Sequence, residues 1–169
     1  MKKLILPLLL TILFVLESVF VDLLPSTLFN VDRLFIPHFV MITLVFIVVY
    51  YNHLLGLVYA IIFGLLFDIV YTEIIGVYMF AYPIISYVLT KAVKVLQTNI
   101  FIISFISIVG VALLEFYVYA VNLIIGFTNM NISVFISDRL FSTLVLNSVF
   151  VILVCYPFKR LLQRLSVTE

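Results

Sequence analysis

Charged residues are scarce in this sequence, since Asp, Glu, Lys and Arg together make up 10% of its 169 residues. A soluble domain carries about 25% charged residues. This chain is instead 66% hydrophobic, with a mean hydropathy of +1.40. A soluble core of this size cannot hide so much apolar surface. The composition therefore excludes an ordinary soluble domain and predicts an integral membrane protein.

Reactive and metal-binding residue types are also few. Cys155 is the single cysteine, which excludes an internal disulfide and a cysteine-based metal site. The sequence contains no HExxH, GxSxG or GxxxxGK[ST] motif, so nothing in it indicates an enzyme or a cofactor. His38 and His53 fall at the ends of predicted helices, where we expect them at the membrane interface and not on a metal. The net charge of +1 gives no indication of nucleic-acid binding.

Long apolar runs separated by short polar turns predict an all-α membrane protein built as a bundle of six transmembrane helices. About 20 helical residues cross a hydrocarbon core of about 30 Å. The predicted spans are residues 4–24, 36–51, 54–70, 77–94, 100–125 and 139–158. Residues 1–169 are thus expected to form a single integral membrane domain. In it, residues 25–35 lie along the interface and residues 126–138 form the longest loop.

The distribution of Lys and Arg predicts the orientation, because cytoplasmic loops are enriched in both residues. Six spans with a cytoplasmic N-terminus place seven of the nine cations on the cytoplasmic side. These seven are Lys2, Lys3, Lys91, Lys94, Lys159, Arg160 and Arg164. Arg33 and Arg139 remain on the outer side. Both termini are therefore predicted to be cytoplasmic.

The third predicted helix carries a stripe of small residues that ends in an acid. Gly56, Ala60, Gly64 and Asp68 recur at four-residue steps and so lie on one face of the helix. Small residues allow a second helix to approach closely in lipid. The stripe, together with Gly76 after it, is a candidate packing surface, either for a helix of the same bundle or for a partner's helix.

Three acids and one arginine are expected at similar depth in the outer half of the membrane: Glu17, Asp68, Glu115 and Arg139. Intramembrane ionisable groups are costly and are usually paired. One interpretation is a polar cluster or cavity that opens to the outside or to a partner's span. The other is that each acid forms local hydrogen bonds and only sets the helix registry.

The sequence resembles the rod shape-determining protein MreD family over nearly its whole length. The resemblance depends mainly on a G-x7-G-x3-D-x7-G pattern in the middle of the chain. Its residues here are Gly56, Gly64, Asp68 and Gly76, and further matches are Glu17, Ser18, Pro37 and, more loosely, Pro83 and Asn147.

The resemblance implies a non-catalytic membrane scaffold of the bacterial cell-wall elongation machinery (the elongasome), located in the plasma membrane and controlling rod shape. The implied partners are an MreC-like bitopic membrane protein and, indirectly, MreB filaments and the glycosyltransferase and transpeptidase of peptidoglycan synthesis. The family is also thought to share its six-helix fold with the substrate-binding subunits of energy-coupling-factor vitamin transporters.

A second hypothesis is a small-molecule-binding subunit of a vitamin-type transporter. It requires a ligand in the outer half of the membrane, lined by Glu17, Asp68, Glu115 or Arg139.

Overall fold

The computed structural model describes residues 4–23, 34–72, 74–96 and 99–166, which form helices and no strands. The longer helices are α1 (Ile5–Leu23), α2 (Phe39–Tyr50), α3 (His53–Tyr71), α4 (Val77–Leu96), α5 (Ile100–Ile125) and α7 (Phe141–Ser166). The short α6 (Ile132–Val134) and the π-helical turn η3 (Phe135–Leu140) lead directly into α7. The predicted all-α class is confirmed.

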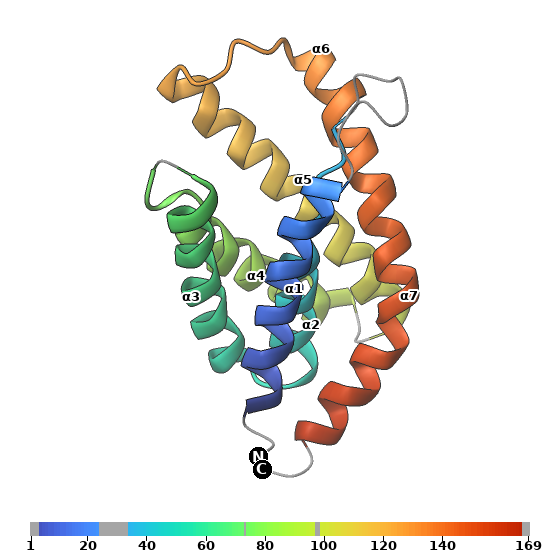
Figure 1. Ribbon diagram of the computed structural model, residues 1–169. Helices are drawn as coiled ribbons and strands as arrows, with labels where there is room; N and C mark the ends of the chain where they lie inside the picture. The colour runs from blue at the N-terminus through green and yellow to red at the C-terminus, as the bar shows by residue number, and fades with distance from the viewer. Residues whose placement is uncertain (1–3, 24–33, 73, 97–98, 167–169) are drawn as a thin grey trace.

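The helix α2 forms the centre of the bundle (Figure 1). Its sequence is apolar on every side, and a helix of this kind is stable only when it is surrounded. Eleven of its 12 residues are buried. It packs against α1, α3, α4, α5 and α7. The other helices therefore form a ring around a short apolar rod.

Within the described ranges, four helices are long and apolar enough to cross a membrane: α3, α4, α5 and the continuous helix from Ile132 to Ser166. The described parts of α1 and α2 are apolar but shorter. With 12 residues, α2 is about 18 Å long at 1.5 Å per residue, less than a hydrocarbon core. Residues 34–38 before it are not helical and lie beside α7, with the Leu34 amide donating to the Asp138 carbonyl at 2.8 Å.

Helix bounds agree with the predicted spans to within three residues, except at the last span. That span was predicted to begin at residue 139 after a long loop, but the helix begins at Ile132. Asn131, Ser133 and Asp138 make this stretch look like a loop, yet Phe135 is fully buried against the ring of Tyr119. The helix also continues past Phe158 to Ser166.

Some predictions concern residues outside the described ranges. They are the interfacial course of residues 25–33 and the positions of Lys2, Lys3 and Arg33.

Figure 1 places the start of α1 and the end of α7 at one end of the bundle, and α6 and the α3–α4 turn at the other.

Candidate functional site

Asp68 lies near the end of α3 and binds the beginning of α4. Its carboxylate accepts hydrogen bonds from the backbone amides of Gly76 (2.7 Å), Tyr78 (2.8 Å) and Met79 (3.0 Å). The first amides of a helix have no partner within the helix, and the helix dipole favours a negative charge there. Asp68, which is fully buried, thus caps a helix other than its own and joins α3 to α4.

The small-residue stripe of α3 faces the interior of the bundle. A Cβ atom on Gly64 would lie 2.5 Å from the Tyr78 carbonyl oxygen of α4, and one on Gly56 would overlap the Val48 side chain of α2. Ala60 between them is fully buried. Gly76 has a φ of +115°, a conformation that glycine adopts without strain.

Glu17 extends from α1 to the beginning of α2. Its Oε1 accepts a hydrogen bond from the Val40 amide at 2.7 Å, and its side chain is 3% exposed. Glu17 therefore does for α2 what Asp68 does for α4, since each carboxylate satisfies an amide in the first turn of another helix.

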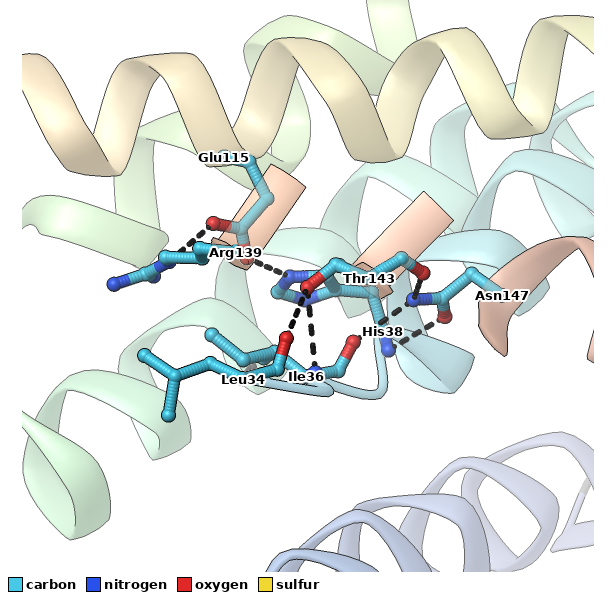
Figure 2. A network of polar contacts seen from close by, with 7 residues as sticks. All are labelled: Leu34, Ile36, His38, Glu115, Arg139, Thr143 and Asn147. Atoms are coloured by element: carbon cyan, nitrogen blue, oxygen red, sulfur yellow. Dashed lines mark hydrogen bonds and ion pairs between the residues drawn. The ribbon is translucent and has the colours of Figure 1, made fainter. Parts of the chain in front are cut away.

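Polar side chains of α7 hold residues 34–38 in place (Figure 2). Asn147 accepts a hydrogen bond from the His38 amide and donates to the Ile36 carbonyl, both at 2.8 Å. One turn away, the Thr143 hydroxyl accepts from the Ile36 amide at 3.3 Å. Buried backbone polar groups need hydrogen-bond partners, and Asn147 and Thr143 provide them for Ile36 and His38.

Glu115 on α5 is the centre of a charged network at the same place. One carboxylate oxygen contacts His38 Nε2 at 2.6 Å, and the other accepts from Arg139 Nε at 2.7 Å (Figure 2). Glu115 and His38 are 1% and 2% exposed, whereas Arg139 is 21% exposed. The network ties α5, the start of α2 and the η3 turn together.

The position of His38 corrects one sequence-based prediction. His38 was expected at the membrane interface, but its side chain is buried and bonded to Glu115. A histidine after a proline at a predicted helix start gives no sign of this, because the contact spans 77 residues of sequence. In the part of the chain that the structure describes, no three His, Cys, Asp or Glu side chains are grouped to hold a metal ion.

The four ionisable residues singled out in the sequence thus lie in three separate places: one ion pair and two carboxylates that each bind the start of another helix. Arg139 and Glu115 form an ion pair. Glu17 and Asp68 instead bind backbone amides of α2 and α4. Thr143, Asn147 and His38 complete the arrangement, and in the sequence Arg139, Thr143 and Asn147 are spaced four residues apart, which places them on one face of a helix.

Two cavities lie beside these contacts. The first has a volume of about 480 Å³, and Arg139, Asn122, Thr72, Tyr71 and Tyr78 are among its lining residues. The second has a volume of about 320 Å³ and is lined by Glu17 and His38 together with the aromatic rings of Phe67, Tyr71 and Tyr78. Since Tyr71 and Tyr78 line both, the two cavities are neighbours.

Comparison with known proteins gives one family. The family model described as rod shape-determining protein MreD matches residues 2–165. The rod shape-determining protein MreD of Bacillus subtilis (strain 168) is 36% identical over 159 residues, covering 94% of this chain and 92% of the relative. No solved structure matches the chain.

Proposed function

Because the chain belongs to the rod shape-determining protein MreD family, a family of structural membrane proteins and not of enzymes, we propose that it is a scaffold of the cell-wall elongation machinery. The chain is a multi-pass protein of the bacterial plasma membrane that determines cell shape. The finer proposal is that it holds an MreC-like bitopic protein and, through it, MreB filaments and the peptidoglycan glycosyltransferase and transpeptidase.

One observation carries the scaffold proposal: most of the buried polar side chains described above hold backbone or one another. Asp68 caps α4, Asn147 holds the segment before α2, and Glu115 joins His38 to Arg139. Buried hydrogen bonds of this kind make a bundle rigid. Any movement that breaks one of them leaves a buried polar group without its partner, which is costly. A rigid bundle suits a protein that positions others.

We extend the proposal to the candidate site residues. Gly56, Ala60, Gly64 and Gly76 serve internal helix packing, which the short distances from Gly64 to the α4 backbone support. Glu17, Asp68, Glu115 and Arg139 set the registry of the helices that they join. A partner helix would then bind other, lipid-facing surfaces, such as the exposed apolar residues Ile12 on α1 or Ile152 on α7.

The proposed topology has six crossings with both termini in the cytoplasm, as in the substrate-binding subunits of energy-coupling-factor transporters. The α2 helix and the non-helical residues 34–38 make one of these crossings together. Helix α2 is about 18 Å long, and five non-helical residues can reach at most about 16 Å, so that together they are long enough for a core of about 30 Å. The location of the start of α1 and the end of α7 at one end of the bundle supports an even number of crossings (Figure 1).

The test combines genetics with biochemistry in the native host. Depletion of the protein should turn rod-shaped cells round, and a tagged copy should copurify with a bitopic membrane protein in mild detergent. Photocrosslinking groups placed at Ile12, Ile62, Phe105 and Ile152, one on each of four outer helices, would then locate the partner surface. Normal rods after depletion, together with a preparation free of partners, would contradict the scaffold function.

The second candidate is the small-molecule-binding subunit of a vitamin-type transporter. The two neighbouring cavities at Arg139 and Glu17 favour it, because ligand pockets have volumes of about 300 Å³ or more. Mass spectrometry of the denatured pure protein tests it. A bound vitamin-like molecule at one copy per chain would support this candidate, and its absence after growth in several media would count against it.

A further inference from the structure

The smaller cavity contains a buried carboxylate that is only half satisfied. Glu17 Oε1 accepts from the Val40 amide, but Glu17 Oε2, although buried, has no hydrogen-bond partner among the described residues. His38 Nδ1 on the same cavity is likewise without a partner there. A buried carboxylate oxygen without a donor is costly, so this cavity offers an acceptor to a ligand that brings a donor or a positive charge.

Aromatic rings form another wall of the cavity. Phe67, Tyr71 and Tyr78 all line it, and the centroid of the Phe67 ring lies 5.2 Å from that of Tyr71 and 5.4 Å from that of Tyr78. The faces of aromatic rings attract cations, and groups of rings are the usual binding sites for organic ammonium ions. A carboxylate with a free oxygen beside three rings has the chemistry of an ammonium site.

The neighbouring cavity supplies the opposite charge. Arg139 lines it and uses Nε for Glu115, and the end of its side chain points away from His38 (Figure 2). No hydrogen bond of its terminal guanidinium nitrogens to another described residue is seen. Guanidinium groups bind phosphate and carboxylate oxygens well. An anionic group on Arg139 and a cationic group on Glu17 would belong to one molecule that passes Tyr71 and Tyr78.

We propose that the two cavities bind a zwitterionic head group, with its ammonium at Glu17 and its oxyanion at Arg139. Phosphoethanolamine, the head group of phosphatidylethanolamine, has this chemistry, and a free zwitterionic amine shares it. The rim favours the lipid, because Val21 and Tyr71 line the smaller cavity and are 52% and 44% exposed on the outer surface of the bundle. The head group would enter from the bilayer between α1 and α3. This inference does not depend on the scaffold function.

The test is native mass spectrometry of the full-length protein in detergent after removal of lipid. The probes are phosphatidylethanolamine, phosphatidylglycerol as a lipid without an ammonium group, and free phosphoethanolamine. We expect phosphatidylethanolamine to bind in preference to phosphatidylglycerol. Glu17→Gln should weaken that binding about tenfold, the effect of losing one charged hydrogen bond. Asp138→Asn, which removes a carboxylate that lines neither cavity, should bind as the unchanged protein does.

Tyr71→Leu keeps the site testable if Glu17→Gln does not fold, because Tyr71 is partly exposed and its loss removes one ring and no buried charge. It should weaken phosphatidylethanolamine binding several-fold. Binding of free phosphoethanolamine that is lost in Glu17→Gln, without lipid binding, would support the site and assign it a soluble amine. Equal binding of the two lipids, or binding that neither variant changes, would overturn the proposal.

Discussion

The Asp68 carboxylate on α3 accepts a hydrogen bond of 2.7 Å from the amide of Gly76, which has a φ of +115° in the turn before α4. Together these two residues stabilise the α3–α4 turn. The glycine lets the backbone turn back toward α3, and the acid satisfies the amides that the turn exposes. The four-residue stripe of α3 therefore ends in a cap, and its small residues bring α4 close enough for the cap to reach.

Asp68→Asn should destabilise the protein, although the side chain keeps its size. An asparagine has one acceptor oxygen, whereas the Asp68 carboxylate uses both oxygens to serve three amides. The amide group of asparagine would also point a donor at other donors. We expect a loss of about 2 to 3 kcal/mol, measured by unfolding in mixed detergent micelles. Asp138→Asn is the control, since that carboxylate bonds the exposed Ser137 hydroxyl; equal losses in the two variants would refute the cap.

Gly64→Ala should be more harmful than Gly110→Ala. A methyl group on Gly64 would lie 2.5 Å from a backbone carbonyl oxygen of α4, and backbone cannot move aside alone. A methyl group on Gly110 would meet the end of the Leu89 side chain at the same distance, and that side chain can rotate. Overpacking costs about 1 to 3 kcal/mol, so we expect this loss for Gly64→Ala and less for Gly110→Ala. Thermal unfolding of the two purified variants gives the comparison, and the reverse order would contradict the close approach of α3 and α4.

The sequence was informative where a local pattern determines structure. Apolar runs predicted the helices, and the run of residues 100–125 matched α5 at both ends, because Asn99 caps its start and Gly126 ends it in a left-handed conformation. The depth of a residue in the membrane can be estimated by counting residues from the ends of its helix. This count predicts that Glu115 and Arg139 lie at a similar depth. Counting cannot show which side chains touch, because that depends on how the helices are rotated and tilted.

The parts that the sequence did not reveal depend on contacts between distant residues. Asn147 bonds the backbone of His38, 109 residues earlier, and this bond is one reason why the chain can remain non-helical until Phe39. The start of the last helix at Ile132 was missed for a similar reason. Phe135 is buried against Tyr119 of α5, and polar neighbours hide that burial in the sequence.

Asn147→Leu should release the segment before α2. The His38 amide and the Ile36 carbonyl would both lose a partner inside the bundle, at about 1 to 3 kcal/mol for each. We expect faster hydrogen exchange at residues 36–40 together with a lower unfolding temperature. Ser148→Ala, a change at the neighbouring position of α7, serves as control. Unchanged exchange in Asn147→Leu would show that the segment is held by other contacts.

Arg139→Gln should be partly rescued by Glu115→Gln. The Glu115 carboxylate is 1% exposed, and the loss of Arg139 would leave His38 as its one remaining partner among the described residues. Removing one partner of a buried ion pair costs about 3 to 5 kcal/mol, and a neutral side chain in place of the remaining charge recovers part of this. The double variant should thus unfold later than Arg139→Gln alone. Arg160→Gln, at an exposed position over Tyr156, should have little effect. If the two effects simply add, the pair is not coupled.

The proposed six-crossing topology predicts that the two ends of the continuous helix from Ile132 to Ser166 can be reached from opposite sides of the membrane. Cys155 is the single cysteine, so a Cys155→Ser background allows one new thiol at a time. We expect Asn129→Cys, exposed between α5 and α6, to react in spheroplasts with a reagent that does not cross the membrane. Gln163→Cys, exposed near the end of α7, should react only after the cells are opened. The five described cations other than Arg139 (Lys91, Lys94, Lys159, Arg160 and Arg164) favour this direction, because cytoplasmic segments are enriched in Lys and Arg. Labelling of Gln163→Cys but not Asn129→Cys in spheroplasts would reverse the orientation, and the Glu17 cavity would then face the cytoplasmic half of the bilayer.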